Sequence, residues 1–186
     1  LGFLDYDKIK EGKMCRHMVM VLPYCASCDA MEELLKAEKD TFKNFGEYEI
    51  INISGIDSIR DYKKPNDVKN KIRECESVNQ KTLTLTVNRM LTGSTVEQWD
   101  TMLYFKDMAS PQEYDQSIFR LQNQYVRTLS SEKGVIKENL KPQTLLVDFD
   151  PDRLFRMQEQ KSLIYNVNTD ENGNKKLKER IMEELR

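Results

Sequence analysis

The sequence predicts an α/β domain built on a largely parallel central sheet. Short apolar stretches with the composition of strands alternate along the chain with stretches whose apolar residues recur at helical spacing. The first apolar stretch, HMVMVL, is apolar almost throughout, as a strand of a parallel sheet is when both of its faces are covered. Alternation of strands and helices is typical of α/β domains. The expected strands cover residues 17–22, 48–53, 82–87, 101–105 and 144–149.

Helices are expected between and after these strands. The strongest start signal is Ser110-Pro111-x-Glu113, which places serine at the N-cap, proline in the first turn and glutamate three residues after the serine. The other expected helices cover residues 26–43, 65–75 and 153–165, the last of them capped by the turn Asp150-Pro151-Asp152.

The rest of the chain is expected to connect or extend this domain. Residues 126–140 are interpreted as a charged connector that contains Gly134. Residues 1–13 are interpreted as a lead-in from a preceding domain, and residues 14–165 as one domain. Residues 166–186 are expected to form a turn-rich linker and a polar amphipathic helix. The chain starts with Leu1 and is interpreted as a fragment of a longer protein.

Composition limits the classes of function. The 186 residues include 29 basic and 31 acidic ones, for a formal net charge of −2, so no global attraction to nucleic acid follows. A single histidine leaves little room for a Ser/His/Asp set. The sequence has no apolar run of transmembrane length and no signal-peptide pattern. With four cysteines, this composition predicts a soluble protein in a reducing, cytoplasmic setting.

Residues 81–126 carry the pattern that is most informative about function. An alternating β-branched strand leads into the polar turn Thr92-Gly93-Ser94-Thr95, and a second strand and the helix that begins at Ser110 follow. That helix carries Gln116 and Arg120, which lie on one face because they are four residues apart.

This order of elements resembles motifs V and VI of the second RecA-like (helicase C-terminal) domain in superfamily 2 helicases and DNA translocases. It is most similar to the motors of restriction enzymes, either the type I restriction (R) subunit or the type III restriction subunit. Thr92 to Thr95 match the threonine-glycine turn, and Gln116 to Arg120 match the Gln-x-x-x-Arg core. The chain departs from the family at Asn123, where a second arginine is usual, and at Glu97, which replaces a common proline.

The resemblance implies a RecA-like three-layer fold with helices on both faces of the sheet, and a part in an ATPase and DNA translocase. Arg120 would be the arginine that stabilises charge on the transferring phosphoryl group, with Gln116 positioning a water or the phosphates. The residues that would face the nucleotide are Gly93, Ser94 and Thr95. Those that would contact the DNA backbone are Thr86, Asn88, Arg89 and Thr92.

The resemblance also implies partners and cofactors. ATP and Mg²⁺ would be bound mainly by an absent first RecA-like domain of the same protein, because this sequence has neither a phosphate loop nor an acidic magnesium motif. We therefore expect the isolated chain to be inactive. Double-stranded DNA is the expected substrate track, modification and specificity subunits are the expected protein partners, and no membrane is expected.

Two other functions remain open. Cys25-x-x-Cys28, at a strand–helix junction, is the pattern of a thioredoxin-like thiol oxidoreductase, although buried cysteines are common without such a role. The arginine missing at Asn123 would suit a non-catalytic, motor-like interaction domain. His17 is expected to be a hydrogen-bonded core residue, and Trp99 is expected to be a core or interface residue rather than one that stacks on a base. The Asp148/Asp150/Asp152 group is expected to cap a helix rather than to bind a divalent ion.

Overall fold

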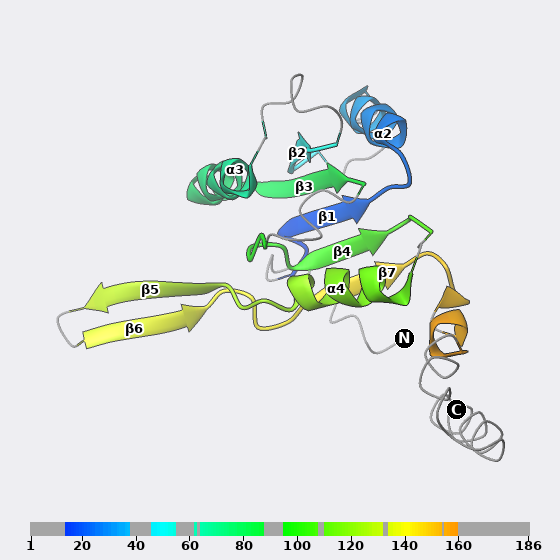
Figure 1. The fold of residues 1–186 in the computed structure, drawn as a ribbon. Coiled ribbons are helices and arrows are strands. Elements are labelled where there is room, and N and C mark those ends of the chain that lie inside the picture. The colour runs from blue at the N-terminus through cyan, green and yellow to red at the C-terminus, as the bar shows by residue number, and fades with distance from the viewer. Residues whose placement is uncertain are drawn as a thin grey trace, which may run out of the picture.

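The computed structural model describes residues 14–37, 46–54, 62, 64–87, 95–107, 110–131, 134–153 and 155–159. Its elements follow the expected alternation closely (Figure 1). In chain order they are β1 (His17–Val21), α2 (Cys25–Ala37), β2 (Tyr48–Asn52), α3 (Pro65–Ser77), β3 (Lys81–Thr86), β4 (Thr101–Tyr104), α4 (Pro111–Leu121), β5 (Val126–Ser131), β6 (Gly134–Asn139) and β7 (Leu145–Asp148).

Five of the strands form one sheet, in the order β2-β3-β1-β4-β7. Every neighbouring pair in this sheet runs parallel. In the centre of the sheet, Val19 of β1 lies between Thr84 of β3 and Met102 of β4. The five expected strands and the parallel sheet are therefore confirmed.

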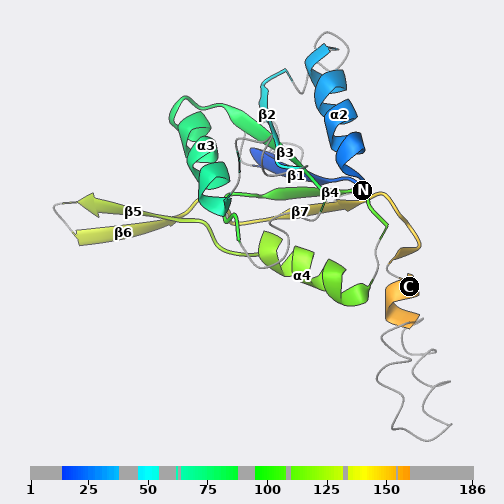
Figure 2. The same ribbon diagram turned by 45° about the horizontal axis from the view of Figure 1, so that its top comes forward.

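Helices cover both faces of the sheet. Successive side chains of a strand point to opposite faces, so alternate residues of β1 pack against different helices. On one face, Val19 and Val21 of β1 belong to a buried cluster that also holds side chains of α3 and α4. These side chains are Val68 and Ile72 of α3 and Tyr114 and Leu121 of α4. On the other face, Met18 and Met20 pack in a cluster with Cys28 and Leu35 of α2. Figure 2 shows α2 and α4 on opposite sides of the sheet. The α/β three-layer arrangement expected of a RecA-like domain is confirmed.

Trp99 and His17 are both buried and hydrogen-bonded in the core. Trp99 is 2% exposed, and its Nε1 donates to Thr84 Oγ1 at 3.2 Å. His17 is also buried, with Nε2 3.3 Å from Glu76 Oε1 and Nδ1 3.0 Å from Thr82 Oγ1. A carboxylate only accepts, so Nε2–H donates to Glu76, and Nδ1 of a neutral ring accepts from the threonine.

The expected helix starts are confirmed. Ser110 Oγ accepts a hydrogen bond from the Glu113 backbone N at 3.4 Å, and Pro111 occupies the first turn of α4. After β7, a helix begins at Arg153, where the backbone N donates to the Asp150 carbonyl at 3.2 Å. The first helix is described from Cys25 to Ala37. Residues 38–43 and 160–165, where two of the helices were expected to continue, lie outside the described residues, as do residues 1–13 and 166–186.

The interpretation of residues 126–140 as a connector is wrong. This segment forms an antiparallel hairpin in which Val126 of β5 pairs with Asn139 of β6 and Ser131 pairs with Gly134. Gly134 has φ +122°, a conformation that favours glycine at the turn. All of β6 is exposed, so the hairpin lacks the alternation of buried and exposed residues that reveals a strand in a sequence. The hairpin projects from the body of the domain (Figures 1 and 2).

None of the helices that the structure describes is long and apolar enough to span a membrane.

Candidate functional site

The structure brings together two of the predicted site residues. Arg120, in the last turn of α4, donates from Nη1 to Thr95 Oγ1 at 3.1 Å. Thr95 is the last residue of the predicted polar turn and lies in the segment that leads into β4. The two residues are 25 positions apart in the sequence, and the packing of α4 against the sheet is what places them in contact.

The other residues of the helical motif lie around this contact. Gln116 is exposed on α4, one turn before Arg120. Asn123, which stands where the family has a second arginine, is also exposed and donates from Nδ2 to the carbonyl oxygen of Arg120 at 3.2 Å. Asn123 therefore satisfies a carbonyl at the C-terminal end of the helix. A side chain in this role adds no positive charge beside Arg120.

Sequence reasoning missed Lys141, a buried cation beside these residues. Lys141 is 6% exposed, and its Nζ donates to the carbonyl oxygens of Glu97 at 2.7 Å, Trp99 at 3.0 Å and Leu121 at 3.0 Å. Burial lowers the pKa of Lys141 to about 8, and the nearby carboxylates of Asp100 and Glu97 act in the opposite direction. No local pattern distinguishes this lysine from the many exposed ones, so the sequence held no signal for it.

Asp100 is a second buried charge that the sequence did not single out. Its Oδ2 accepts from the backbone N of Arg16 at 2.8 Å and from that of His17 at 3.4 Å. Burial raises the pKa of the Asp100 carboxyl, while hydrogen bonds that include one from Thr101 partly offset that rise. Asp100 thus ties the segment before β4 to the start of β1.

The predicted DNA-contact residues are placed only in part. Thr86 is fully buried at the end of β3, and its carbonyl oxygen accepts from the Leu22 backbone N at 2.8 Å. Because its hydroxyl is not on the surface, this conformation does not let Thr86 contact a DNA backbone. The remaining predicted residues of the turn region lie outside the described residues; they are Asn88, Arg89, Thr92, Gly93 and Ser94.

Asp148, the last residue of β7, and Asp150 accept hydrogen bonds within the domain. Asp148 Oδ2 accepts from Tyr114 Oη at 2.7 Å and from Arg153 Nε at 2.8 Å. The backbone N of Asp152 donates to Asp150 Oδ1 at 3.1 Å. Within the described part of the chain, no group of three or more His, Cys, Asp or Glu side chains could hold a metal ion.

The two cysteines of the Cys-x-x-Cys pattern differ in accessibility. Cys25 is the first residue of α2 and is exposed, whereas Cys28 is 0% exposed and packs in the core under α2. Neither Cys25 nor Cys28 is in a disulfide bond in the structure. Cys28 is therefore a core residue, and Cys25 is a surface residue.

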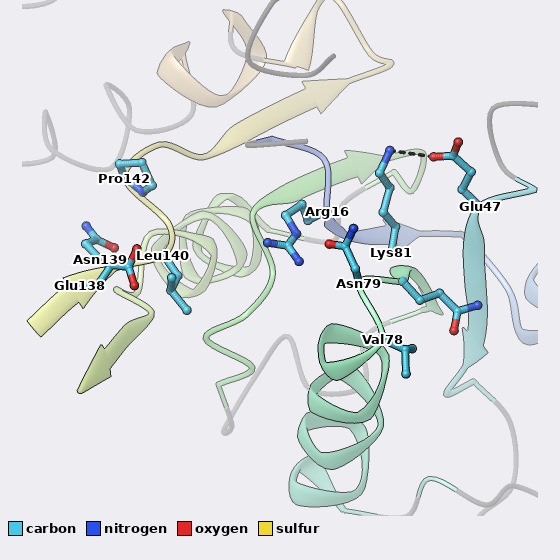
Figure 3. A pocket seen from close by; sticks show the side chains of 10 residues that line it. Arg16, Glu47, Val78, Asn79, Lys81, Glu138, Asn139, Leu140 and Pro142 are labelled. Carbon is cyan, nitrogen blue, oxygen red and sulfur yellow. Dashed lines mark hydrogen bonds and ion pairs between the residues drawn. The ribbon is translucent and has the colours of Figure 1, made fainter. Parts of the chain in front are cut away.

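A groove of ≈ 830 Å³ lined mainly by polar residues lies elsewhere, at the end of the sheet where β3 begins. Figure 3 shows Lys81 and Glu47 on one side of it and residues of the β6 end, such as Asn139, on the other. Lys81 Nζ forms an ion pair with Glu47 Oε2 at 3.0 Å. Of the predicted site residues that the structure describes, none lines this groove, so it is separate from the Arg120–Thr95 contact.

Similarity to known proteins bears on the function of this site. No family model matches the chain. Over 132 residues, or 71% of its length, the chain is 30% identical to the C-terminus of RM.MpnORF110P from Mycoplasma pneumoniae, named as a candidate type II restriction enzyme and methyltransferase. The chain is thus similar to part of a restriction enzyme. It spans only 18% of the length of that relative.

A solved structure, the C-terminal part of the Fun30 ATPase domain, aligns with 81% of this chain and 40% of that chain. The TM-score is 0.45 and the sequence identity is 11%. A likeness at this level says nothing about what the chain binds or does.

Proposed function

We propose that this chain is the second RecA-like domain of an ATP-dependent DNA translocase or helicase motor in a restriction–modification enzyme. The observation that most supports the proposal is the 3.1 Å hydrogen bond from Arg120 Nη1 to Thr95 Oγ1. It joins a residue of the Gln-x-x-x-Arg core to a residue of the threonine-glycine turn, the two motifs on which the resemblance rests. The similarity to RM.MpnORF110P adds independent support for a restriction enzyme.

In this proposal Arg120 acts on ATP that another domain holds. A guanidinium stays charged at all relevant pH values and can offset the charge that develops on a transferring γ-phosphoryl group. Gln116 is exposed on the same helix face, as a residue that positions a water or a phosphate must be. Gly93, Ser94 and Thr95 would border the nucleotide. The sequence has no phosphate loop, so the first RecA-like domain would bind ATP and Mg²⁺.

The DNA track would run beside the same turn. Asn88, Arg89 and Thr92 are the proposed contacts to the phosphate backbone, because amide, guanidinium and hydroxyl groups commonly bind phosphate oxygens. Buried Thr86 is assigned to the core instead. A type I or type III motor, with modification and specificity subunits as partners, remains a proposal, and the relative is named as a type II enzyme.

The test is ATP hydrolysis by the full-length protein, with and without double-stranded DNA. We expect Arg120→Ala to reduce turnover by about 10³-fold or more while ATP binding is retained. Arg127→Ala is the matched control, because Arg127 is an exposed arginine whose partner is Glu138 on the neighbouring strand of the hairpin. Unchanged turnover in Arg120→Ala would show that the motif match is accidental. The isolated chain should not hydrolyse ATP.

The two alternatives make different predictions in the same experiments. A non-catalytic interaction domain would leave the full-length protein without ATPase activity. A thiol oxidoreductase would use Cys25 and Cys28 and would be independent of Arg120. Exposed Cys25 and buried Cys28 are compatible with the thiol oxidoreductase, because in a dithiol centre one exposed thiol attacks the substrate disulfide and the second thiol then attacks the mixed disulfide within the protein.

A further inference from the structure

We infer that Lys141 is a positioning residue that holds the two sides of the Arg120–Thr95 contact together. This inference rests on the proposed function. Lys141 follows β6 and lies almost completely inside the domain, with 6% of its surface exposed. Its three hydrogen bonds bind two chain segments that are separated in the sequence, one at Glu97 and Trp99 and the other at Leu121.

The carbonyl groups bound by Lys141 belong to the segments that carry the two contacting residues. Glu97 and Trp99 lie two and four positions after Thr95, in the segment that enters β4. Leu121 follows Arg120 directly and is the last residue of α4. One ammonium group therefore binds both the segment that carries Thr95 and the end of the helix that carries Arg120.

The chemistry of this contact requires a lysine. An ammonium group has three N–H donors, and here each donor meets one carbonyl oxygen. The carbonyl of Leu121 lies at the C-terminal end of α4, where helix carbonyls lack partners within the helix and where positive charge is favourable. The Lys141 backbone N donates to Asn139 Oδ1 at 3.0 Å, which fixes the main chain from which the side chain enters the core.

Loss of Lys141 should displace Arg120 without removing it. Three carbonyls, two of them in fully buried contacts, would lose the Lys141 donor, and the two segments would separate or admit water. A displacement of about 1 Å at a catalytic group can cost on the order of 10²-fold in rate. We therefore expect an effect on turnover that is smaller than that of Arg120→Ala.

The experiment uses the full-length protein and measures DNA-dependent ATP hydrolysis under steady-state conditions. Lys141→Met is expected to reduce kcat by about 10- to 100-fold with little change in the KM for ATP. Lys137→Met, an exposed lysine of β6, is the matched control and should match the wild type. In the Arg120→Ala background, Lys141→Met should cause no further loss, because it acts through Arg120.

Hydrogen exchange distinguishes positioning from a general loss of stability. Lys141→Met should increase exchange in residues 95–100 and 118–124 while the amides of the central strands keep their protection. If Lys141→Met does not fold, Lys141→Gln, which keeps two N–H donors, is tested by the same criteria.

Each outcome has a distinct meaning. If Arg120→Ala abolishes turnover but Lys141→Met leaves kcat unchanged, the role assigned to Lys141 is wrong and the proposed function stands. A further loss on top of Arg120→Ala, or increased exchange throughout the domain, would also overturn the positioning role. If Arg120→Ala itself leaves turnover unchanged, the proposed function fails first.

Discussion

Replacement of Arg153 by methionine should destabilise the domain strongly. Arg153 is 4% exposed at the start of the helix that follows β7. Its Nε donates to Asp148 Oδ2 at 2.8 Å, and its Nη2 donates to the carbonyl oxygen of Lys106 at 2.8 Å. Its guanidinium carbon also lies 5.1 Å and 5.6 Å from the ring centroids of Tyr104 and Tyr114. Arg153→Met keeps the apolar stem and removes all of these polar contacts.

The expected loss of unfolding free energy follows from the burial of the Arg153–Asp148 ion pair. The side chain of Asp148 is 15% exposed and that of Arg153 is 5% exposed, so loss of the cation leaves a nearly buried carboxylate with Tyr114 as its remaining side-chain donor. Breaking a buried pair by removing one partner costs about 3–5 kcal/mol. At roughly 2–4 °C per kcal/mol for a chain of this size, the melting temperature should fall by about 6–20 °C. The ion pair with exposed Asp107, at 3.7 Å, contributes little to this sum.

The assay is thermal and urea unfolding of the 186-residue chain, followed by circular dichroism. Arg156→Met is the matched control, since Arg156 lies on the same helix, pairs with Asp150 and has a side chain that is 56% exposed. Loss of that exposed pair should cost less than about 1 kcal/mol. Equal destabilisation by the two variants would refute the argument, because it would show that burial of the Arg153–Asp148 pair has no special weight.

Two further predictions concern Glu76 and the cysteines. Burial raises the pKa of Glu76, but hydrogen bonds from His17 and Tyr125 outweigh it and hold this pKa below the ordinary value of 4.5. The stabilisation is therefore present above pH 4.5 and is lost as the pH falls through the folded-state pKa. Glu76→Gln should be destabilised at pH 7 in urea unfolding, and its difference from the wild type should shrink in acid; a constant difference would contradict this. In native protein, a maleimide should label exposed Cys25 and should reach Cys28 only after unfolding, whereas a reversible Cys25–Cys28 disulfide formed on oxidation would support the oxidoreductase alternative.

The sequence determined most of the secondary structure because the signals that define it are local. The serine–proline start of α4 and the apolar run of β1 were both expected from residues a few positions apart, and both are present. The β5–β6 hairpin was missed for the same reason, because β6 is exposed along its whole length and so has no alternating pattern of buried and exposed residues.

The candidate site was predicted only where a motif marked it. The Gln-x-x-x-Arg spacing pointed to Arg120, and the polar turn pointed to Thr95, but the sequence did not show that the two side chains are in contact. Lys141 has no motif, and its role depends on carbonyl groups that lie 20 to 44 residues away. Every residue has a backbone carbonyl, so the residue types at those positions do not reveal that the Lys141 side chain binds there.

What the sequence by itself determined is thus an alternation of strands and helices, their capping residues and a pair of motif positions. The tertiary structure alone decided the strand order β2-β3-β1-β4-β7, the burial of Thr86 and Cys28, and the meeting of Arg120, Thr95 and the Lys141 ammonium around one helix end. The physical reason is the distance along the chain over which each interaction acts. Helix caps and apolar periodicity act over a few residues, whereas burial and hydrogen bonding to distant carbonyls exist only after the sheet has brought remote segments together.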